Sequence, residues 1–94
     1  MFELTAFQRD LLYVAAGLDQ PSGQQIKSEL KKEINEITHG RLYPNLDALV
    51  ESGYITRGSI DRRTNYYELT EFGERSLRER RDWENQYVEL EGPP

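Results

Sequence analysis

Apolar residues recur at the spacing of an α-helix in the first half of the chain, and this pattern predicts three helices. We expect the first over residues 5–17, because Thr5 and Gln8 have the spacing of a capping box and apolar residues follow on one face. The second starts at a similar box, formed by Ser22 and Gln25, and its narrow apolar stripe leaves it half exposed to water. This stripe consists of Ile26, Leu30 and Ile34.

The third helix is predicted between Thr38, which can cap its start, and Gly53, which can end it in a left-handed conformation. Pro44 is unusual here, since a proline inside a helix costs roughly 3 kcal/mol but is tolerated in the first turn. We therefore expect a start near Gly40 or a local distortion, with backbone groups left open to outside partners. The buried face consists of Leu42, Leu46, Leu49 and Val50.

The second half of the chain changes to a strand pattern before a last, charge-rich helix. Alternation predicts strands over residues 54–60 and 65–69, joined by a turn. Thr70 can cap the final helix, whose apolar positions are too sparse for burial on all sides. This order predicts a mainly α fold with a small β-hairpin, a winged helix-turn-helix with an added C-terminal helix.

Length and composition favour one small soluble domain. The 94 residues allow a single modest core, and without cysteine and with one histidine neither a disulfide nor a structural zinc site is expected. We find no membrane-spanning run and no signal peptide, which predicts a cytoplasmic protein. Residues 1–70 are assigned to a DNA-binding domain, 71–90 to a dimerisation helix and 91–94 to a frayed tail.

The net charge of −5 and the pI near 4.9 oppose contact with phosphates. The acidity is regional, however, because residues 66–94 hold eight acidic and four basic side chains while residues 1–65 are nearly balanced. Nine of the twelve basic residues are arginines, which suits a cytoplasm of high ionic strength. A halophilic source is a hypothesis on these grounds, and salt would then weaken the electrostatic part of DNA binding.

The start of the third helix offers polar side chains that suit DNA contact. Arginine pairs with guanine and asparagine with adenine, and N–H groups at a helix start bind phosphate. The alternative is that Tyr43 is half-buried and Asn45 merely solvated. No second histidine or cysteine would help His39 hold a metal. The candidates are His39, Gly40, Arg41, Tyr43 and Asn45.

Two further segments could complete a DNA-binding surface. Arg62, Arg63 and Thr64 at the hairpin tip suit the minor groove, where negative potential attracts arginine, although charged turns are common for solubility alone. On the second helix, Gln24 and Lys27 could touch phosphates, and a merely solvated face is as good an explanation.

The last helix carries apolar residues that suit a homodimer interface. Trp83 lies so far along a charged helix that it needs a surface beyond the small core, and a symmetric copy supplies one. Folding back on the same chain is the alternative, and Phe2, Leu4 and Phe7 are possible contributors. The predicted interface consists of Phe72, Leu77, Trp83, Tyr87 and Val88.

Two segments together resemble the PadR-like winged-helix transcriptional regulators. The first runs from His39 through Leu42-Tyr43-Pro44 to Leu46, and the second joins Tyr66 to Thr70 and Gly73. The resemblance spans roughly residues 5–77. It implies a homodimer, usually a repressor, on a pseudo-palindromic operator, and the acidity and arginine bias are similar to those of members from salt-loving archaea. The short C-terminal part departs from members that have an effector domain.

The residues thus favour a sequence-specific DNA-binding regulator with no cofactor. The alternative is a winged-helix module that docks on a protein without touching DNA, which the negative charge would allow. An enzyme is disfavoured because the chain offers no nucleophile beside a base, no metal cluster and no glycine-rich phosphate loop. The operator and any small-molecule effector stay unidentified, although Phe7, Tyr13, Trp83 and Tyr87 could line a ligand site between subunits.

Overall fold

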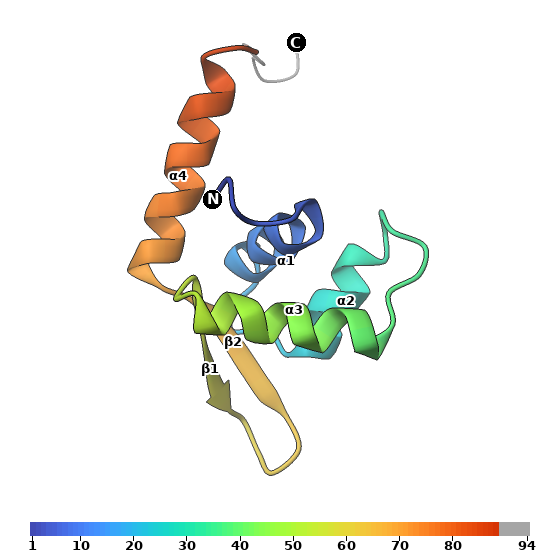
Figure 1. Cartoon of the computed structure of the whole chain (residues 1–94). Helices are drawn as coiled ribbons and strands as arrows, with labels where there is room; N and C mark the ends of the chain where they lie inside the picture. The colour runs from blue at the N-terminus through green and yellow to red at the C-terminus, as the bar shows by residue number, and fades with distance from the viewer. Residues whose placement is uncertain (89–94) are drawn as a thin grey trace.

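A computed structural model describes residues 1–88 and shows four helices and one hairpin (Figure 1). The frayed tail expected at residues 91–94 lies outside the described part. The helix expected up to residue 90 ends earlier, at Asn85. The elements are α1 (Ala6–Gly17), α2 (Gly23–Leu30), α3 (His39–Glu51), β1 (Ile55–Ser59), β2 (Asn65–Leu69) and α4 (Glu71–Asn85).

The predicted capping boxes start both α1 and α2. Thr5 accepts from the Gln8 backbone while the Gln8 side chain accepts from the Thr5 backbone, and Ser22 and Gln25 do the same on α2. Helix α2 is shorter than the apolar stripe suggested, because Ile34 lies beyond its end, half-buried against the core. The apolar position is therefore real, but a turn and not the helix places it there.

Helix α3 runs through Pro44 without a break. It begins at His39, where the Thr38 hydroxyl accepts from the Arg41 backbone at 3.2 Å. Pro44 lacks the N–H that would bond to the Gly40 carbonyl, so this carbonyl is free for water or another partner. The helix ends before Gly53, whose φ of 82° is the left-handed conformation that the sequence suggested.

The hairpin is held to the helices at its second strand. Strands β1 and β2 pair antiparallel, with Arg57 opposite Tyr67 and Ser59 opposite Asn65. The segment before α2 adds a short third partner, since Ser22 forms a bridge with Tyr66 and the Tyr67 N–H donates to the Pro21 carbonyl at 2.8 Å. This anchor fixes the hairpin of β1 and β2 with its turn, residues 55–69 and here called the wing, relative to the start of α2.

One core lies beneath α1, α2, α3 and the base of the hairpin. It contains Leu11, Leu12, Ile26, Leu42, Leu46, Leu49, Tyr54, Ile55 and Tyr67, all at most 2% exposed. Helix α4 leaves this body on the side away from the hairpin (Figure 1). Its first turn is tightly docked, because a Cβ on Gly73 would lie 2.2 Å from the Tyr54 carbonyl oxygen. Within residues 1–88, no helix is both long and apolar enough to cross a membrane.

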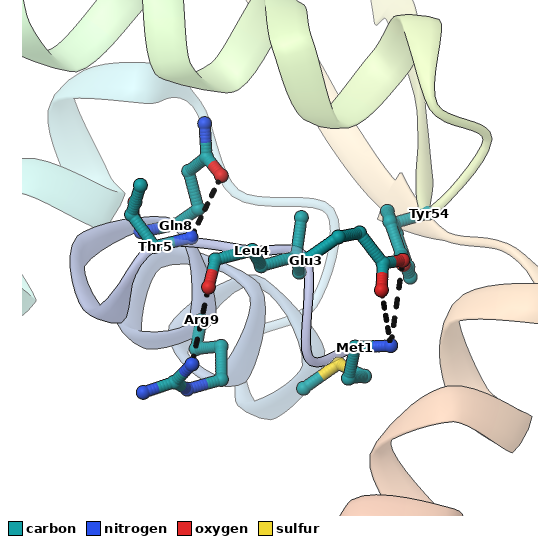
Figure 2. A network of polar contacts seen from close by, with 7 residues as sticks. All are labelled: Met1, Glu3, Leu4, Thr5, Gln8, Arg9 and Tyr54. Atoms are coloured by element: carbon teal, nitrogen blue, oxygen red, sulfur yellow. Dashed lines mark hydrogen bonds and ion pairs between the residues drawn. The ribbon is translucent and has the colours of Figure 1, made fainter.

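The segment before α1 lies close to the junction between α3, β1 and α4. The Tyr54 hydroxyl donates a hydrogen bond to the Glu3 carboxylate (Figure 2). This bond lowers the pKa of Glu3 to about 2, and burial together with the same bond raises the pKa of Tyr54 to about 12. Leu4 and Phe7 are buried core residues. Because these two side chains are buried within their own chain, they offer almost no surface to a second copy. The expectation that they contribute to a dimer interface is therefore wrong.

Candidate nucleic-acid interface

A polar stripe runs along the side of α3 that faces α2 and the wing. It consists of His39, Tyr43 and Asp47, which follow one another at intervals of one helical turn. The His39 and Tyr43 rings lie 5.5 Å apart between centroids. The Tyr43 hydroxyl accepts from Gln24 Nε2 at 3.1 Å, and Asp47 forms an ion pair with Arg57 of β1 at 2.5 Å. Both neighbouring elements therefore hold this stripe in place.

A hollow of about 350 Å³ lies where α2, α3 and the wing meet. It brings together four side chains that the sequence predicted from three separate segments, namely Gln24, Tyr43, Arg63 and Thr64. The remaining lining residues are Ser22, Gly23, Asn65 and Tyr67. The surface is polar at its rim, concave and built from the same elements that winged-helix proteins place against a duplex.

The wing tip is a defined turn with two exposed arginines. The Asp61 carboxylate accepts from the backbone N–H groups of Arg63 and Thr64 at 2.8 and 2.9 Å, and these bonds lower its pKa. The Ile60 N–H closes the loop by donating to the Thr64 carbonyl at 2.8 Å. Arg62 and Arg63 are both exposed. Asp61 therefore shapes the turn, while the arginines stay available to an outside anion.

Arg41 and Asn45 lie on the opposite side of α3, toward α1. The Arg41 guanidinium lies over the Phe7 ring, 3.9 Å from its centroid, and the residue is exposed. The Asn45 side chain donates to the Arg41 carbonyl at 2.7 Å and accepts from Gln8 Nε2 at 3.0 Å. The structure therefore does not bring these two residues together with Tyr43 and the wing, and Asn45 is occupied within its own chain.

The structure does not bring the candidates Gly40 and Lys27 together either. Gly40 is exposed near the start of α3, whereas Lys27 is half-buried on α2 and does not line the hollow. Sequence reasoning missed Arg57 and Asp47 as partners. Arg57 lies on a strand whose alternation of apolar and polar residues is weak. Only the pairing of β1 with β2 and its position beside α3 show that the side chains of Arg57 and Asp47 meet.

The apolar residues of α4 fall into two groups. Phe72 packs on Tyr54, with 4.9 Å between ring centroids, and Leu77 is half-buried against the core. Trp83 packs edge-on against Phe2 of its own chain at 4.9 Å and stays 38% exposed. Tyr87 and Val88, which follow α4, are 70% and 52% exposed. The end of α4 and the residues directly after it are therefore the part left without a cover within the described chain.

The sequence of the chain matches the model of a known protein family. The model of the transcriptional regulator PadR-like family matches residues 11–79, which is well over half of the chain. The chain belongs to the PadR-like family. The resemblance seen in the sequence is thereby confirmed, and so are the winged-helix fold and the expectation that the protein is a regulator and not an enzyme.

Solved structures agree with the PadR-like assignment. RosR of Halobacterium salinarum, from crystals grown from NaBr, gives a TM-score of 0.87 at 38% identity, covering 96% of this chain and 82% of RosR. A RosR-S1 complex gives 0.85 at 41% identity, covering 90% and 76%. Streptococcus pneumoniae FabT in complex with DNA shares the fold, with a TM-score of 0.73, 24% identity and coverage of 93% and 59%. No curated protein sequence matches the chain.

Proposed function

We propose that this PadR-like regulator binds double-stranded DNA sequence-specifically as a homodimer and acts as a repressor on a pseudo-palindromic operator. One observation carries the proposal, namely that Gln24, Tyr43, Arg63 and Thr64 line a single concave surface. FabT, which shares the fold, occurs in a complex with DNA, and this supports DNA as the partner.

In this proposal α3 enters the major groove through its polar stripe. His39 and Tyr43 face base edges, and Gly40 allows close approach of the backbone. Arg41 reaches the duplex from the α1 side, with Asn45 beside it, once its guanidinium leaves Phe7. Moving the Arg41 guanidinium from the Phe7 ring to a phosphate or a guanine costs little free energy, because the stacked guanidinium is exposed.

The wing and α2 lie beside the start of α3, which in this proposal reads the base sequence and is here called the reading head. Arg62 and Arg63 enter the minor groove beside it, and Thr64 supports the turn from the rim of the hollow. On α2, Gln24 and Lys27 contact the DNA backbone.

The second copy packs against α4. The proposed interface uses Trp83 near the end of α4 together with Tyr87 and Val88 just after it. Phe72 and Leu77 fix α4 to its own body and border the contact. Residues 1–70 then form the DNA-binding unit and residues 71–90 the dimerisation helix. Two reading heads about one helical turn apart would match an operator with twofold symmetry.

The composition and the relatives give the working conditions. An arginine-rich, acidic chain that is 38% identical to a protein of the halophilic archaeon Halobacterium salinarum supports a halophilic source and a cytoplasm of high salt. Under such conditions counterion release contributes little, so base contacts and shape carry more of the affinity.

A fluorescence anisotropy titration tests the proposal. The protein is titrated against duplexes from its own promoter region and against random duplex of equal length, in potassium chloride at the concentration of the native cytoplasm. We expect tight, saturable binding to one promoter segment and much weaker binding to random duplex. Equal affinity for both, or binding to neither, would leave the protein-docking alternative as the better explanation.

A further inference from the structure

Asp47 is an acidic residue at a position where a negative charge opposes DNA binding. It continues the polar stripe of α3 one turn beyond Tyr43, and its side chain is 51% exposed. A carboxylate on this face would approach phosphates and raise the free energy of the complex. Either a cation must neutralise it, or its oxygens must find a donor on the DNA.

Arg57 supplies the neutralising cation from the wing. Its Nη1 donates to Asp47 Oδ1 at 2.5 Å, and this bond raises the pKa of the guanidinium. Arg57 lies on β1, directly opposite Tyr67 of β2, and its side chain is 41% exposed. The pair therefore links the wing to the outward side of α3 and leaves the carboxylate fixed in direction.

Only one oxygen of the carboxylate is used by this link. Among residues 1–88, no donor is placed on Asp47 Oδ2, whereas an ionised carboxylate can accept several hydrogen bonds. A carboxylate cannot donate, so it cannot satisfy the N7 or O6 acceptors of the purines in the major groove. The base that offers it a donor without an adjacent N7 acceptor is cytosine, through its N4 amino group.

We propose that Asp47 is a specificity-determining residue whose free oxygen accepts a hydrogen bond from the N4 amino group of a cytosine, and that Arg57 is the positioning residue that aims it. The inference deepens the proposed function and rests on it, because the face that carries Asp47 must enter the major groove. It predicts one cytosine in each half of the operator that depends on Asp47.

A purely structural role for the pair is the competing explanation. In that case Asp47 and Arg57 only fasten the wing to α3, and losing either residue weakens binding to every sequence alike. Exposed ion pairs contribute little to stability, which makes a fastening role alone a weak reason for an acid on this face. The two roles differ in base preference, which a structural contact does not change.

The experiment starts with the full-length wild-type chain and a pool of randomised duplexes at high potassium chloride. The best duplex is then remade with each half-site position changed in turn, and affinities are measured by anisotropy. Asp47→Ala removes the carboxylate, Asp47→Asn keeps its shape, and Arg57→Ala and Arg57→Lys remove and keep the positioning charge. Asp10→Asn is the matched control, an exposed acid on α1 that does not line the hollow between α2, α3 and the wing.

The wild type should prefer cytosine at one symmetric pair of positions by about tenfold over other bases. Asp47→Ala should abolish this preference at that pair and keep it elsewhere, while Asp47→Asn should shift it toward adenine, which an amide can bind through N6 and N7. Arg57→Ala should lose the same preference and Arg57→Lys should restore part of it. Asp10→Asn should resemble the wild type.

The failures are distinguishable. If the wild type enriches no sequence, the proposed function itself is wrong. If it enriches an operator but Asp47→Ala and Asp47→Asn keep every base preference, the assignment of Asp47 is overturned and the pair is a fastening contact. Thermal melting of each variant confirms that it is folded, and the isosteric Asp47→Asn keeps the test valid if the alanine variant unfolds.

Discussion

The contact between Gly23 and Tyr43 controls how closely α2 and α3 approach. A Cβ at Gly23 would lie 2.7 Å from Cε1 of the Tyr43 ring, closer than real side chains come. The same ring carries the hydroxyl that accepts from Gln24. A glycine that could be dismissed as a loose helix start is thus required for the position of a candidate reading residue.

Gly23→Ala should therefore weaken DNA binding more than it weakens the fold. The tyrosine ring must turn outward, which loses one hydrogen bond and lowers the free energy of unfolding by about 1 kcal/mol. Operator affinity should fall by about tenfold, as for a lost base contact. Gly17→Ala is the control, because a Cβ there meets nothing within 4 Å and should raise stability by about 0.5 kcal/mol. Equal operator affinity for the two variants would contradict the role of Tyr43.

The Glu3 carboxylate ties stability to acid pH. Its pKa falls from the ordinary value of 4.5 to about 2 in the folded chain, first through the bond from the Tyr54 hydroxyl and further through a backbone hydrogen bond and the Met1 ammonium (Figure 2). A depressed pKa means that the contribution is complete above pH 4.5 and is lost as the pH falls toward 2. Glu3→Gln should thus lower the urea midpoint at neutral pH and approach the wild type near pH 2.

Tyr54→Phe is the partner variant for this prediction. It removes the donor and should flatten the same part of the pH profile, and adding Glu3→Gln to it should change the profile little further. A wild-type profile that stays flat between pH 4.5 and 2 would show that this bond does not couple to folding.

Residue identities alone predicted the local contacts of this chain but not the distant ones. The capping roles of Thr5, Ser22 and Thr38 follow from spacings of three residues and are confirmed. The stacking of Arg41 on Phe7 joins two helices through their packing angle, which no local pattern contains. Arg41 was therefore placed correctly at the start of α3, while its direction toward α1 could not be foreseen.

At the level of elements, the hairpin is stiffened at two places. Its second strand pairs with the segment before α2 through Ser22 and Tyr66, and its tip is closed by Asp61. The strand pattern predicted β2 correctly and β1 to within a residue at each end. The bridge to α2 was missed, because a single pair of residues leaves no periodic signal in the sequence.

Replacing both wing arginines should weaken binding to all duplexes. Arg62→Ala with Arg63→Ala removes two exposed charges of the fixed turn, which the proposed function places in the minor groove, without changing a residue of the α3 stripe. Affinity should fall alike for operator and random DNA, and the slope of log affinity against log salt should flatten by about 2. The control is Arg75→Ala with Arg78→Ala on α4, which changes the net charge equally. A loss confined to the operator would contradict a phosphate role.

At the scale of the whole molecule, the wing and α4 project from opposite sides of one body (Figure 1). DNA on the side of the wing and a second copy on α4 would therefore not compete for the same surface. The charge follows a similar division, since residues 71–94 hold seven acidic and four basic side chains while residues 1–70 hold ten acidic and eight basic ones. An acidic protein can thus present a nearly neutral face to a duplex.

Trp83 is a poor probe of the dimer because it also packs on Phe2, so its loss would disturb the monomer. Tyr87 is better, since it is 70% exposed and, among residues 1–88, the ring that packs on it is that of Trp83, with 5.2 Å between centroids. Tyr87→Ala should raise the dimer dissociation constant by about tenfold, as for an aromatic interface residue, with an unchanged circular dichroism spectrum. Analytical ultracentrifugation over a concentration series measures this constant.

The same variant connects assembly to DNA recognition. A monomer with one reading head contacts one half-site, so Tyr87→Ala should bind the full operator weakly at low protein concentration and recover at concentrations that restore the dimer. Its affinity for a single half-site should equal that of the wild type, because Tyr87 lies beyond the end of α4 and does not line the hollow between α2, α3 and the wing. If Tyr87→Ala binds the operator with wild-type affinity while it is a monomer, the proposal that two subunits joined through α4 recognise the operator is wrong. A single subunit would then account for binding.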